Sequence, residues 1–452
     1  MDGVTRELGH GAAGGAAPGR RQSASPPGLR FARWALGCVA AAGLGLSGCV
    51  VGGDVGVGAA EDRPLEVRAD TLFRVGALDG AEWETFQRIT AVGFDEEGGL
   101  LILDGSSARA IKVDPSGQHQ FTAGGRGEGP GELRGAATGL SVLERGAFLL
   151  WDPAGGAYRR FSSEGVYIGS HRMSQDLVPA ASRATMHPSG ALLRWDASVR
   201  EISGGEEPRP AGVPLRFEPL DEDGSREVAR LWRPTPLTDR VLLVGPGQAP
   251  IGREERVHAP GLHVAVLADG RIAVSDSSDY RIRLYGPDGA VAGELRRPIE
   301  PVPVTDAMIR EERTRRLAEI GPAPSPAQAG MVLSPDGSWR PARPGEDGWR
   351  LTQEKAVAAL EFWSEIPVIE GIAVDRRGRL WVERVRGPDE DGGAIDLFSG
   401  EGRYLGTIPP GRIRMPLAFG PDDVVAWVER DELGVEYVRV ARLSIEEGGG
   451  DD

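Results

Sequence analysis

Three ionisable side chains stand at matching or adjacent positions in a short pattern that recurs along the chain. Arg183 and His263 each precede a turn glycine by seven residues, and Glu370 precedes another turn glycine by eight. If the recurring segments lie side by side, these side chains converge at one end of them. An arginine there could hold an anion, the histidine could exchange a proton, and the glutamate could orient the histidine. The structural alternative is that Arg183 and His263 fill space and bond backbone carbonyls.

The recurring pattern is an apolar segment that leads into a tight turn, and it occurs six times. Apolar residues stand six and four positions before the turn residue, with a small residue between them, and another apolar residue follows two positions after it. Because side chains alternate across a strand, apolar positions two apart define one buried face. The six turn residues are Gly98, Gly146, Gly190, Gly270, Gly378 and Asp423.

The number and spacing of these segments predict an all-β fold, a six-bladed β-propeller over residues 65–446. Intervals of 48, 44 and 45 residues suit four-stranded blades, whereas intervals of 80 and 108 residues must contain insertions. The last blade lacks a fourth strand, and we expect residues 65–75 to supply it. The ring would thus be closed by the N-terminal strand, which removes the exposed edges. Residues 447–452 are expected to be a disordered tail.

The longest interval predicts a helical insertion between blades 4 and 5, at residues 303–366. Thr305 is expected to cap a helix that reaches Ile320, and a second helix is expected from Thr352 to Trp363. Together they would form a flap over one end of these blades. Such a flap either covers a site or simply packs there.

Residues 1–48 have the features of a secretory signal peptide. Arginines precede an apolar run from Trp34 to Leu46 that is too short to span a bilayer, and Leu-Ser-Gly-Cys follows at 46–49. This ending resembles the bacterial lipobox, so we expect lipidation of Cys49 and a flexible tether at 49–64. The alternative is an ordinary signal peptide with an incidental cysteine. Val50 follows the cysteine in place of the aspartate that retains lipoproteins at the inner membrane, which favours the outer membrane.

The net charge and the cysteine content limit the kinds of partner that the protein can have. Removal of residues 1–48 lowers the net charge from −15 to −18, because five arginines and two acids are lost. Such a chain does not suit nucleic acid. Cys38 leaves with the signal peptide, so no disulfide is expected. The expected partners are the membrane, through the lipid anchor only, and an envelope protein, glycan or small molecule, with the chain as a monomer.

Two stretches resemble the NHL repeat. Ser275–Gly289 (SDSSDYRIRLYGPDG) has a strand-end aspartate, then an arginine, alternating apolar residues and a turn, and Phe121–Leu133 (FTAGGRGEGPGEL) looks like the glycine-rich connection between NHL blades. Over residues 65–446 the chain resembles the six-bladed NHL-like β-propeller lipoproteins of Gram-negative bacteria. One departure is Arg384, which stands in blade 5 where other blades have a strand-end acid. The resemblance implies a fold and leaves the function open.

Enzymes of related propeller families use metal ions that this sequence does not suit. Gluconolactonase-like and paraoxonase-like propellers hold calcium with asparagine ligands, and the chain has no asparagine. Amidating-lyase-like propellers bind zinc through several histidines, but His187 and His263 would lie about 13 Å apart along the axis. We therefore expect no metal and no cofactor. The strand-end acids are expected to cap turns and not to bind a metal; they are Asp104, Asp152, Asp196, Asp276 and Glu429.

Two classes of function remain open. In the first, an envelope-anchored, non-catalytic binding or scaffolding propeller recognises a partner protein, glycan or small anionic ligand at the mouth of its central channel. In the second, a hydrolase or lyase uses Arg183, His263 and Glu370 as anion holder, base and orienter. No nucleophile motif such as G-x-S-x-G accompanies the histidine, which favours the first class.

Overall fold

The computed structural model describes residues 54–56, 61–172, 182–196, 212–221, 224–232, 256–323, 330–333, 339–387, 390 and 392–447. The expected signal peptide, Cys49 and the tail from residue 448 lie outside these ranges. No helix in the described ranges has the length and apolar character needed to cross a membrane.

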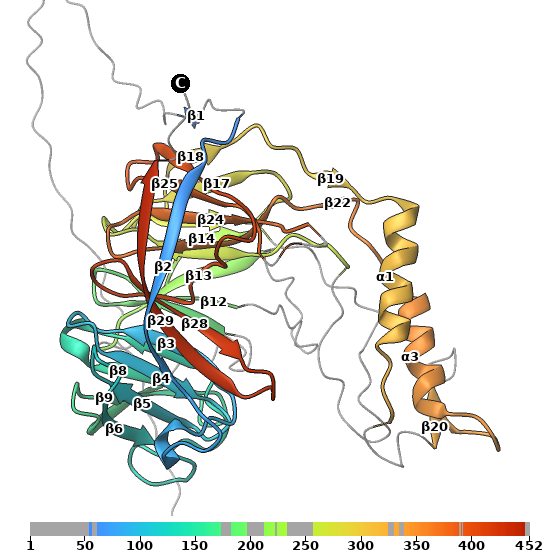
Figure 1. The fold of residues 1–452 in the computed structure, drawn as a ribbon, viewed down its shortest axis with the longest axis horizontal. Helices are drawn as coiled ribbons and strands as arrows, with labels where there is room; N and C mark the ends of the chain where they lie inside the picture. Colours follow the sequence, from blue (N-terminus) through green and yellow to red (C-terminus); the bar gives the residue numbers. More distant parts are fainter. Residues whose placement is uncertain are drawn as a thin grey trace, which may run out of the picture. The chain divides into compact units, whose positions relative to one another are not determined.

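Six sheets of four or more strands follow one another along the chain (Figure 1). The first strand of each blade lies next to the first strand of a neighbouring blade, so these strands are innermost. Blade 1 comprises β3 (Ile89–Phe94), β4 (Leu100–Asp104), β5 (Arg109–Val113) and β6 (His119–Gly124). Blade 2 comprises β7 (Gly139–Val142), β8 (Phe148–Asp152), β9 (Ala157–Phe161) and β10 (Tyr167–Arg172). Blade 3 comprises β11 (Ser182–Met186), β12 (Leu192–Asp196), β13 (Val213–Glu218) and β14 (Arg226–Leu231).

The remaining blades complete the predicted six-bladed propeller. Blade 4 comprises β15 (His263–Val266), β16 (Ile272–Ser275), β17 (Arg281–Tyr285) and β18 (Val291–Arg296). Blade 5 comprises β23 (Ile369–Val374), β24 (Leu380–Arg384), β25 (Ile395–Phe398) and β26 (Tyr404–Ile408). Blade 6 comprises β27 (Ala418–Phe419), β28 (Val424–Arg430), β29 (Glu436–Glu447) and β2 (Leu65–Val75).

The ring closes as the sequence predicts, through the N-terminal strand. β2 pairs antiparallel with β29, from Leu65 opposite Glu447 to Val75 opposite Val438. β27 of blade 6 also lies next to β3 of blade 1. A buried apolar cluster fills each of the six interfaces between neighbouring blades, and the one between blades 6 and 1 includes Val438 and Phe94. Ring closure therefore buries the same kind of core at every boundary.

The turn residues explain why glycine recurs at one position of the pattern. The five turn glycines have φ between 76° and 85°, and Asp423 has φ of 57°. Glycine adopts this left-handed conformation without steric cost, and aspartate tolerates it better than most residues. One apolar position departs from the pattern: Leu417 precedes the short strand β27 and is 62% exposed.

The insertion between blades 4 and 5 is helical, with a two-stranded stem of β19 (Val302–Pro303) and β22 (Glu365–Ile366). α1 (Asp306–Ala318) begins as predicted, because Thr305 Oγ1 accepts a hydrogen bond from the Met308 amide at 3.3 Å. The predicted bounds of the second helix are wrong. α3 spans Gly348–Ala358, because Asp347 and not a residue near Thr352 caps it. A short hairpin, β20 (Met331–Leu333) and β21 (Trp339–Pro341), accompanies the helices.

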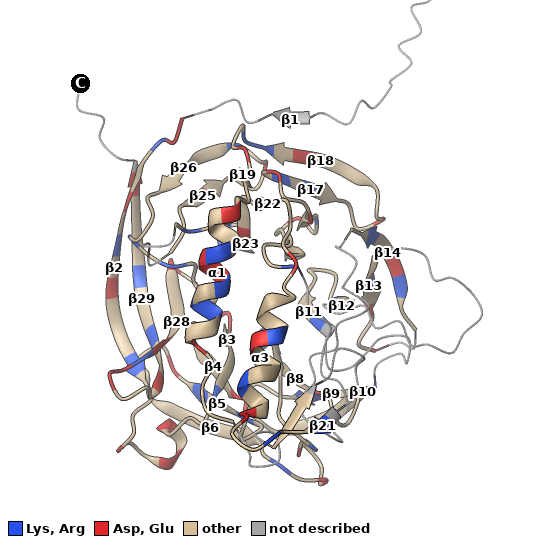
Figure 2. Cartoon of the chain, turned by 90° about the vertical axis from the view of Figure 1, so that its right-hand side faces the viewer, with Lys and Arg blue, Asp and Glu red and all other residues tan. Residues whose placement is uncertain are grey.

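Trp363 lies beyond α3 and attaches the insertion to blade 4. Its amide donates to the Val257 carbonyl at 2.8 Å, and its indole Nε1 donates to Ser278 Oγ at 3.1 Å. Ser278 is in the turn from β16 to β17, at the end of the blade where the innermost strand begins. The insertion is thus held at that end of the propeller, and Figure 2 shows α1 and α3 in front of the ring when it is viewed from their side.

Two strand-end acids cap turns as predicted. Asp104 accepts from the Ser107 amide at 3.4 Å, and Asp152 accepts from the Gly155 amide at 2.9 Å. Asp276 instead accepts from the Trp232 amide of the preceding connection at 3.1 Å. Glu429 accepts from the side chains of Tyr437 and Arg439 and, within the described ranges, from no turn amide. The side chain of Asp196 lies outside the described part of the structure.

Candidate functional site at the mouth of the central channel

The channel mouth is the end of the propeller at which the innermost strands begin. Arg183 is the second residue of β11, His263 is the first of β15, and Glu370 is the second of β23. These strands belong to three consecutive blades, and β15 lies between the other two. Glu370 stands at a β-bulge, between Ile369 and Gly371. The structure therefore brings the three residues to the same end of the ring.

The His263 ring packs against the backbone segment that leads into its own strand. A Cβ at Gly261 would lie 2.4 Å from His263 Nε2, so a glycine two residues upstream leaves the space for the imidazole. Burial, together with the positive charge of Arg183, lowers the pKa of His263 to about 4. The imidazole is thus neutral at pH 7 and can both donate and accept a hydrogen bond.

Arg183 is exposed at the channel mouth. Among the described residues, its guanidinium has no hydrogen-bond or ion-pair partner, although its charge acts on His263. It therefore does not bond backbone carbonyls of the described ranges, as the structural alternative required. A guanidinium in this setting is available to a carboxylate or phosphate group.

Glu383 is a fourth polar residue of the channel mouth, and sequence reasoning missed it. It lies on β24, opposite Gly371 in the register, and its Oε2 lies 3.9 Å from where a Gly371 Cβ would be. Burial and the negative charge of Glu370 raise the pKa of Glu383, while the amides of Gly393 and Met415 act in the opposite direction. The available signal was the glycine opposite it, which leaves room for a long side chain.

The four residues place a cationic group on one side of the channel mouth and two carboxyl groups on the other side. Arg183 on blade 3 is cationic, Glu370 and Glu383 on blade 5 are acidic, and the neutral His263 on blade 4 lies between them. Such an arrangement suits a ligand with an acid group toward blade 3 and a hydrogen-bond donor toward blade 5. No three His, Cys, Asp or Glu residues in the described ranges are grouped closely enough to hold a metal ion.

The lowered pKa of His263 predicts a pH dependence of stability. The folded-state pKa of about 4 lies below the ordinary value of 6.5. Between these pH values the unfolded chain takes up a proton at His263 and the folded chain does not, so stability falls as the pH is lowered through this window. The His263→Gln variant should lose part of that slope, whereas His119→Gln, at an exposed histidine of blade 1, should keep it. Equal slopes in chemical unfolding of all three proteins would contradict this expectation.

A cavity of ≈ 300 Å³ lies at the opposite end of blades 5 and 6, among the turns that follow β23 and β27. Two of its arginines are held by carboxylates of the same wall: Arg379 bonds Asp375 at 2.6 Å and Asp423 at 2.9 Å, and Arg377 also pairs with Asp423. The third, Arg376, donates to the backbone carbonyls of Phe94 and Phe419. These ion pairs stabilise the packing of the two turns against each other. We therefore place the candidate site at the channel mouth.

No protein-family model matches the chain, and no curated protein matches it. Several solved structures are similar at low identity. A member of the DUF4221 family from Bacteroides vulgatus is 9% identical, with a TM-score of 0.45, over 85% of this chain and 99% of the other. A gluconolactonase from Xanthomonas campestris is 14% identical (TM-score 0.36; 83% and 90%), and a streptogramin B lyase is 9% identical (TM-score 0.35; 84% and 98%). At these values the likenesses give no basis for assigning an activity.

Proposed function

We propose that this chain is an exported, lipid-anchored propeller that binds a ligand at its channel mouth without transforming it. The ligand carries an acid group and a hydrogen-bond donor. Arg183 and His263 bind the acid group, and Glu370 and Glu383 accept from the donor. A small molecule, a glycan or an exposed segment of an envelope protein can present these groups. The observation that supports the proposal is the convergence of polar side chains from three consecutive blades at the end of the ring where the helical insertion is attached.

The lipid anchor in this proposal rests on the sequence. A basic region, a short apolar run and Leu-Ser-Gly-Cys at 46–49 are the parts of a lipoprotein signal. Outer-membrane placement rests on Val50. These features agree with a propeller whose site is used in the cell envelope.

A second candidate, a hydrolase or lyase at the same mouth, is favoured by one observation. The pKa of Glu383 is raised and the pKa of His263 is lowered, and shifted pKa values of an acid and a base are common at sites of acid–base catalysis. Catalysis also requires a nucleophile or an activated water, for which neither the sequence nor the described residues offer a dedicated group. Binding is therefore the proposal.

The experiment is a thermal-shift screen of the soluble mature domain against carboxylates, phosphates, amino acids, sugar acids and divalent metal ions. We expect at least one compound with an acid group to raise the melting temperature of the wild type. The shift should be lost in Arg183→Ala and reduced in His263→Ala. Arg403→Ala, an exposed arginine on blade 5 away from the innermost strands, is the matched control and should respond like the wild type.

The outcomes separate the two candidates. A shift that is lost in Arg183→Ala and reduced in His263→Ala supports binding at the mouth. A shift that neither variant changes moves the site elsewhere on the protein and contradicts the proposal. Strong stabilisation by a divalent ion in the wild type but not in His263→Ala contradicts the non-catalytic reading.

A further inference from the structure

The segment before β2 does not leave the propeller at Leu65 but continues along its outer rim. We call the described parts of this segment the N-terminal strap: Asp54–Gly56, which forms β1, and Glu61–Pro64. β1 pairs in parallel with β18, the outermost strand of blade 4. Pro64 forms a parallel bridge with Thr407 of β26, the outermost strand of blade 5. The strap therefore passes blades 4 and 5 before β2 joins blade 6.

Blade 5 has a reversed ion pair at the place where the strap is held. In four other blades an acid at the end of the second strand pairs with an arginine of the third. These pairs are Asp104 with Arg109 at 3.5 Å, Asp152 with Arg159 at 3.0 Å, Asp276 with Arg283 at 3.3 Å, and Glu429 with Arg439 at 2.9 Å. In blade 5 the arginine is on the second strand and the acid on the third, with Arg384 and Asp396 at 3.2 Å. The Arg384 that interrupts the sequence pattern is one half of this reversed pair.

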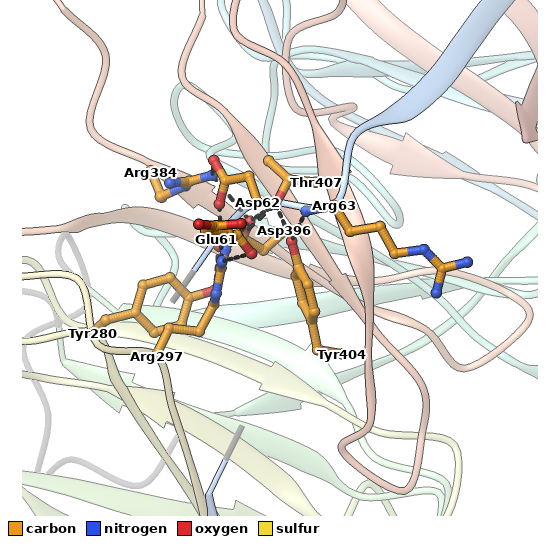
Figure 3. Close-up of polar contacts among 9 residues, drawn as sticks. All are labelled: Glu61, Asp62, Arg63, Tyr280, Arg297, Arg384, Asp396, Tyr404 and Thr407. Atoms are coloured by element: carbon orange, nitrogen blue, oxygen red, sulfur yellow. Dashed lines mark hydrogen bonds and ion pairs between the residues drawn. The ribbon is translucent and has the colours of Figure 1, made fainter. Parts of the chain in front are cut away.

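The reversed pair places the guanidinium of Arg384 where a carboxylate of the strap, that of Asp62, pairs with it (Figure 3). Asp62 pairs with Arg384 at 2.7 Å and with Arg297 at 2.9 Å, and Arg297 also pairs with Asp396 at 2.8 Å. The side chains of Arg297 and Asp396 are fully buried. Burial acts to raise the pKa of Asp62, but its bonds to Arg384 and Arg297 outweigh this and the pKa lies below its ordinary value.

Backbone groups of Glu61 and Arg63, on either side of Asp62, are also bonded to the propeller. The Arg63 amide donates to Tyr404 Oη at 3.2 Å, and the Arg63 carbonyl accepts from the Thr407 amide at 2.7 Å. Arg297 donates to the Glu61 carbonyl at 3.3 Å. Because both charged and backbone groups are engaged, the strap is fixed to the boundary of blades 4 and 5.

We infer that the strap makes the outer rim of blade 4 the part of the propeller that lies against the lipid bilayer, with the channel opening sideways. This inference rests on the lipid anchor of the proposed function. The chain spans at most about 43 Å from Cys49 to Glu61, and at most about 18 Å from Cys49 to Asp54, since an extended residue covers no more than about 3.6 Å. An anchor on Cys49 therefore keeps β18 near the bilayer and leaves the opposite blade, blade 1, farther away.

The test uses the full lipidated protein, which has no other cysteine after the signal peptide is removed. Ala292→Cys places a fluorescent donor on an exposed position of β18, and Gln120→Cys places it on an exposed position of β6, the outermost strand of blade 1. Each labelled protein is inserted into phospholipid vesicles that carry an acceptor on the lipid headgroups. We expect greater energy transfer from position 292 than from position 120. A flexible Gly-Ser linker inserted between Val50 and Val51 should abolish the difference.

Three results are possible, and each decides a different point. Greater transfer from position 292, lost on insertion of the linker, supports the inference. Equal or reversed transfer in protein that is bound to the vesicles overturns the orientation and leaves the anchor intact. Failure of the full-length protein to enter the membrane fraction of the expressing cells overturns the proposed anchor, and the inference falls with it.

Discussion

Replacing Asp396 with alanine is expected to lower the free energy of unfolding by roughly 3–5 kcal/mol. Asp396 is fully buried and accepts from Arg297, Arg384, Thr407 and Tyr280, the last at 2.7 Å. Its removal takes one carboxylate partner from the buried Arg297 and takes from the buried Tyr280 hydroxyl the acceptor that Asp396 provides. Burial and the neighbouring Asp396 raise the pKa of Tyr280 well above its ordinary value, so this hydroxyl stays a donor. Urea unfolding of the soluble mature domain measures the loss.

Two controls separate the buried network from a general effect of losing a carboxylate. Glu66→Ala removes an exposed acid of β2 and should change stability by less than about 0.5 kcal/mol. The double variant Arg384→Asp with Asp396→Arg gives blade 5 the polarity of blades 1, 2, 4 and 6 but sets two arginines against each other, at positions 297 and 396. It should be no more stable than Asp396→Ala. A loss in Asp396→Ala as small as that in Glu66→Ala would show that the network contributes little.

Replacing Cys49 with serine is expected to move the protein from the membrane fraction to the soluble fraction of the envelope. A serine cannot carry the thioether-linked diacylglycerol. One acyl chain alone binds a membrane only marginally, whereas two or more anchor it stably, so loss of the modification should be nearly all-or-none. Fractionation of the expressing cells, followed by detection of the protein, measures the change.

Cys38 provides the matched control for this prediction. It lies within the apolar run of the signal segment, so Cys38→Ser should leave both processing and membrane association unchanged. Membrane association that survives Cys49→Ser would mean that Leu-Ser-Gly-Cys is incidental. The proposed anchor would then be wrong, while the fold and the channel mouth would stand.

The fold was accessible from the sequence because its signals are local and repeated. A left-handed turn residue, glycine in five blades and Asp423 in the sixth, recurs with the apolar positions around it, and the missing strand of blade 6 pointed to residues 65–75. Thr305 likewise marked the start of α1. The bounds of α3 failed because two capping candidates stand close together, and only the attachment of Trp363 to blade 4 shows that the helix has ended before it.

The channel mouth was only partly accessible. Arg183, His263 and Glu370 follow from their positions relative to the turn residues, because innermost strands align around one axis. Glu383 does not, since it lies on a second strand and reaches the mouth through the space above Gly371. The strap lies within the range expected as a flexible tether (49–64), and its pairing with the propeller was missed for a related reason. Its ion pair from Asp62 to Arg384 joins residues 322 positions apart, which leaves no local pattern.

Arg384 nevertheless carried a signal that sequence reasoning noticed and did not use. It departs from the strand-end acids of the other blades, and Asp396 stands where blades 2, 4 and 6 have an arginine. A paired exchange of charge at two positions that are diagonal neighbours on adjacent strands indicates that the same contact is made with opposite polarity. A departure that has a compensating partner is therefore a better guide to a special site than a single unusual residue.

The most direct test of binding at the channel mouth is calorimetric titration of the soluble mature domain with the best compound from the thermal-shift screen. Arg183→Ala should weaken its affinity roughly 10- to 100-fold, because a charge-assisted hydrogen bond contributes about 1.5–3 kcal/mol. Arg183→Lys, which keeps the charge, should recover part of the affinity, and Arg403→Ala should match the wild type. Equal affinity of the wild type and Arg183→Ala would contradict a ligand site at the mouth of the channel.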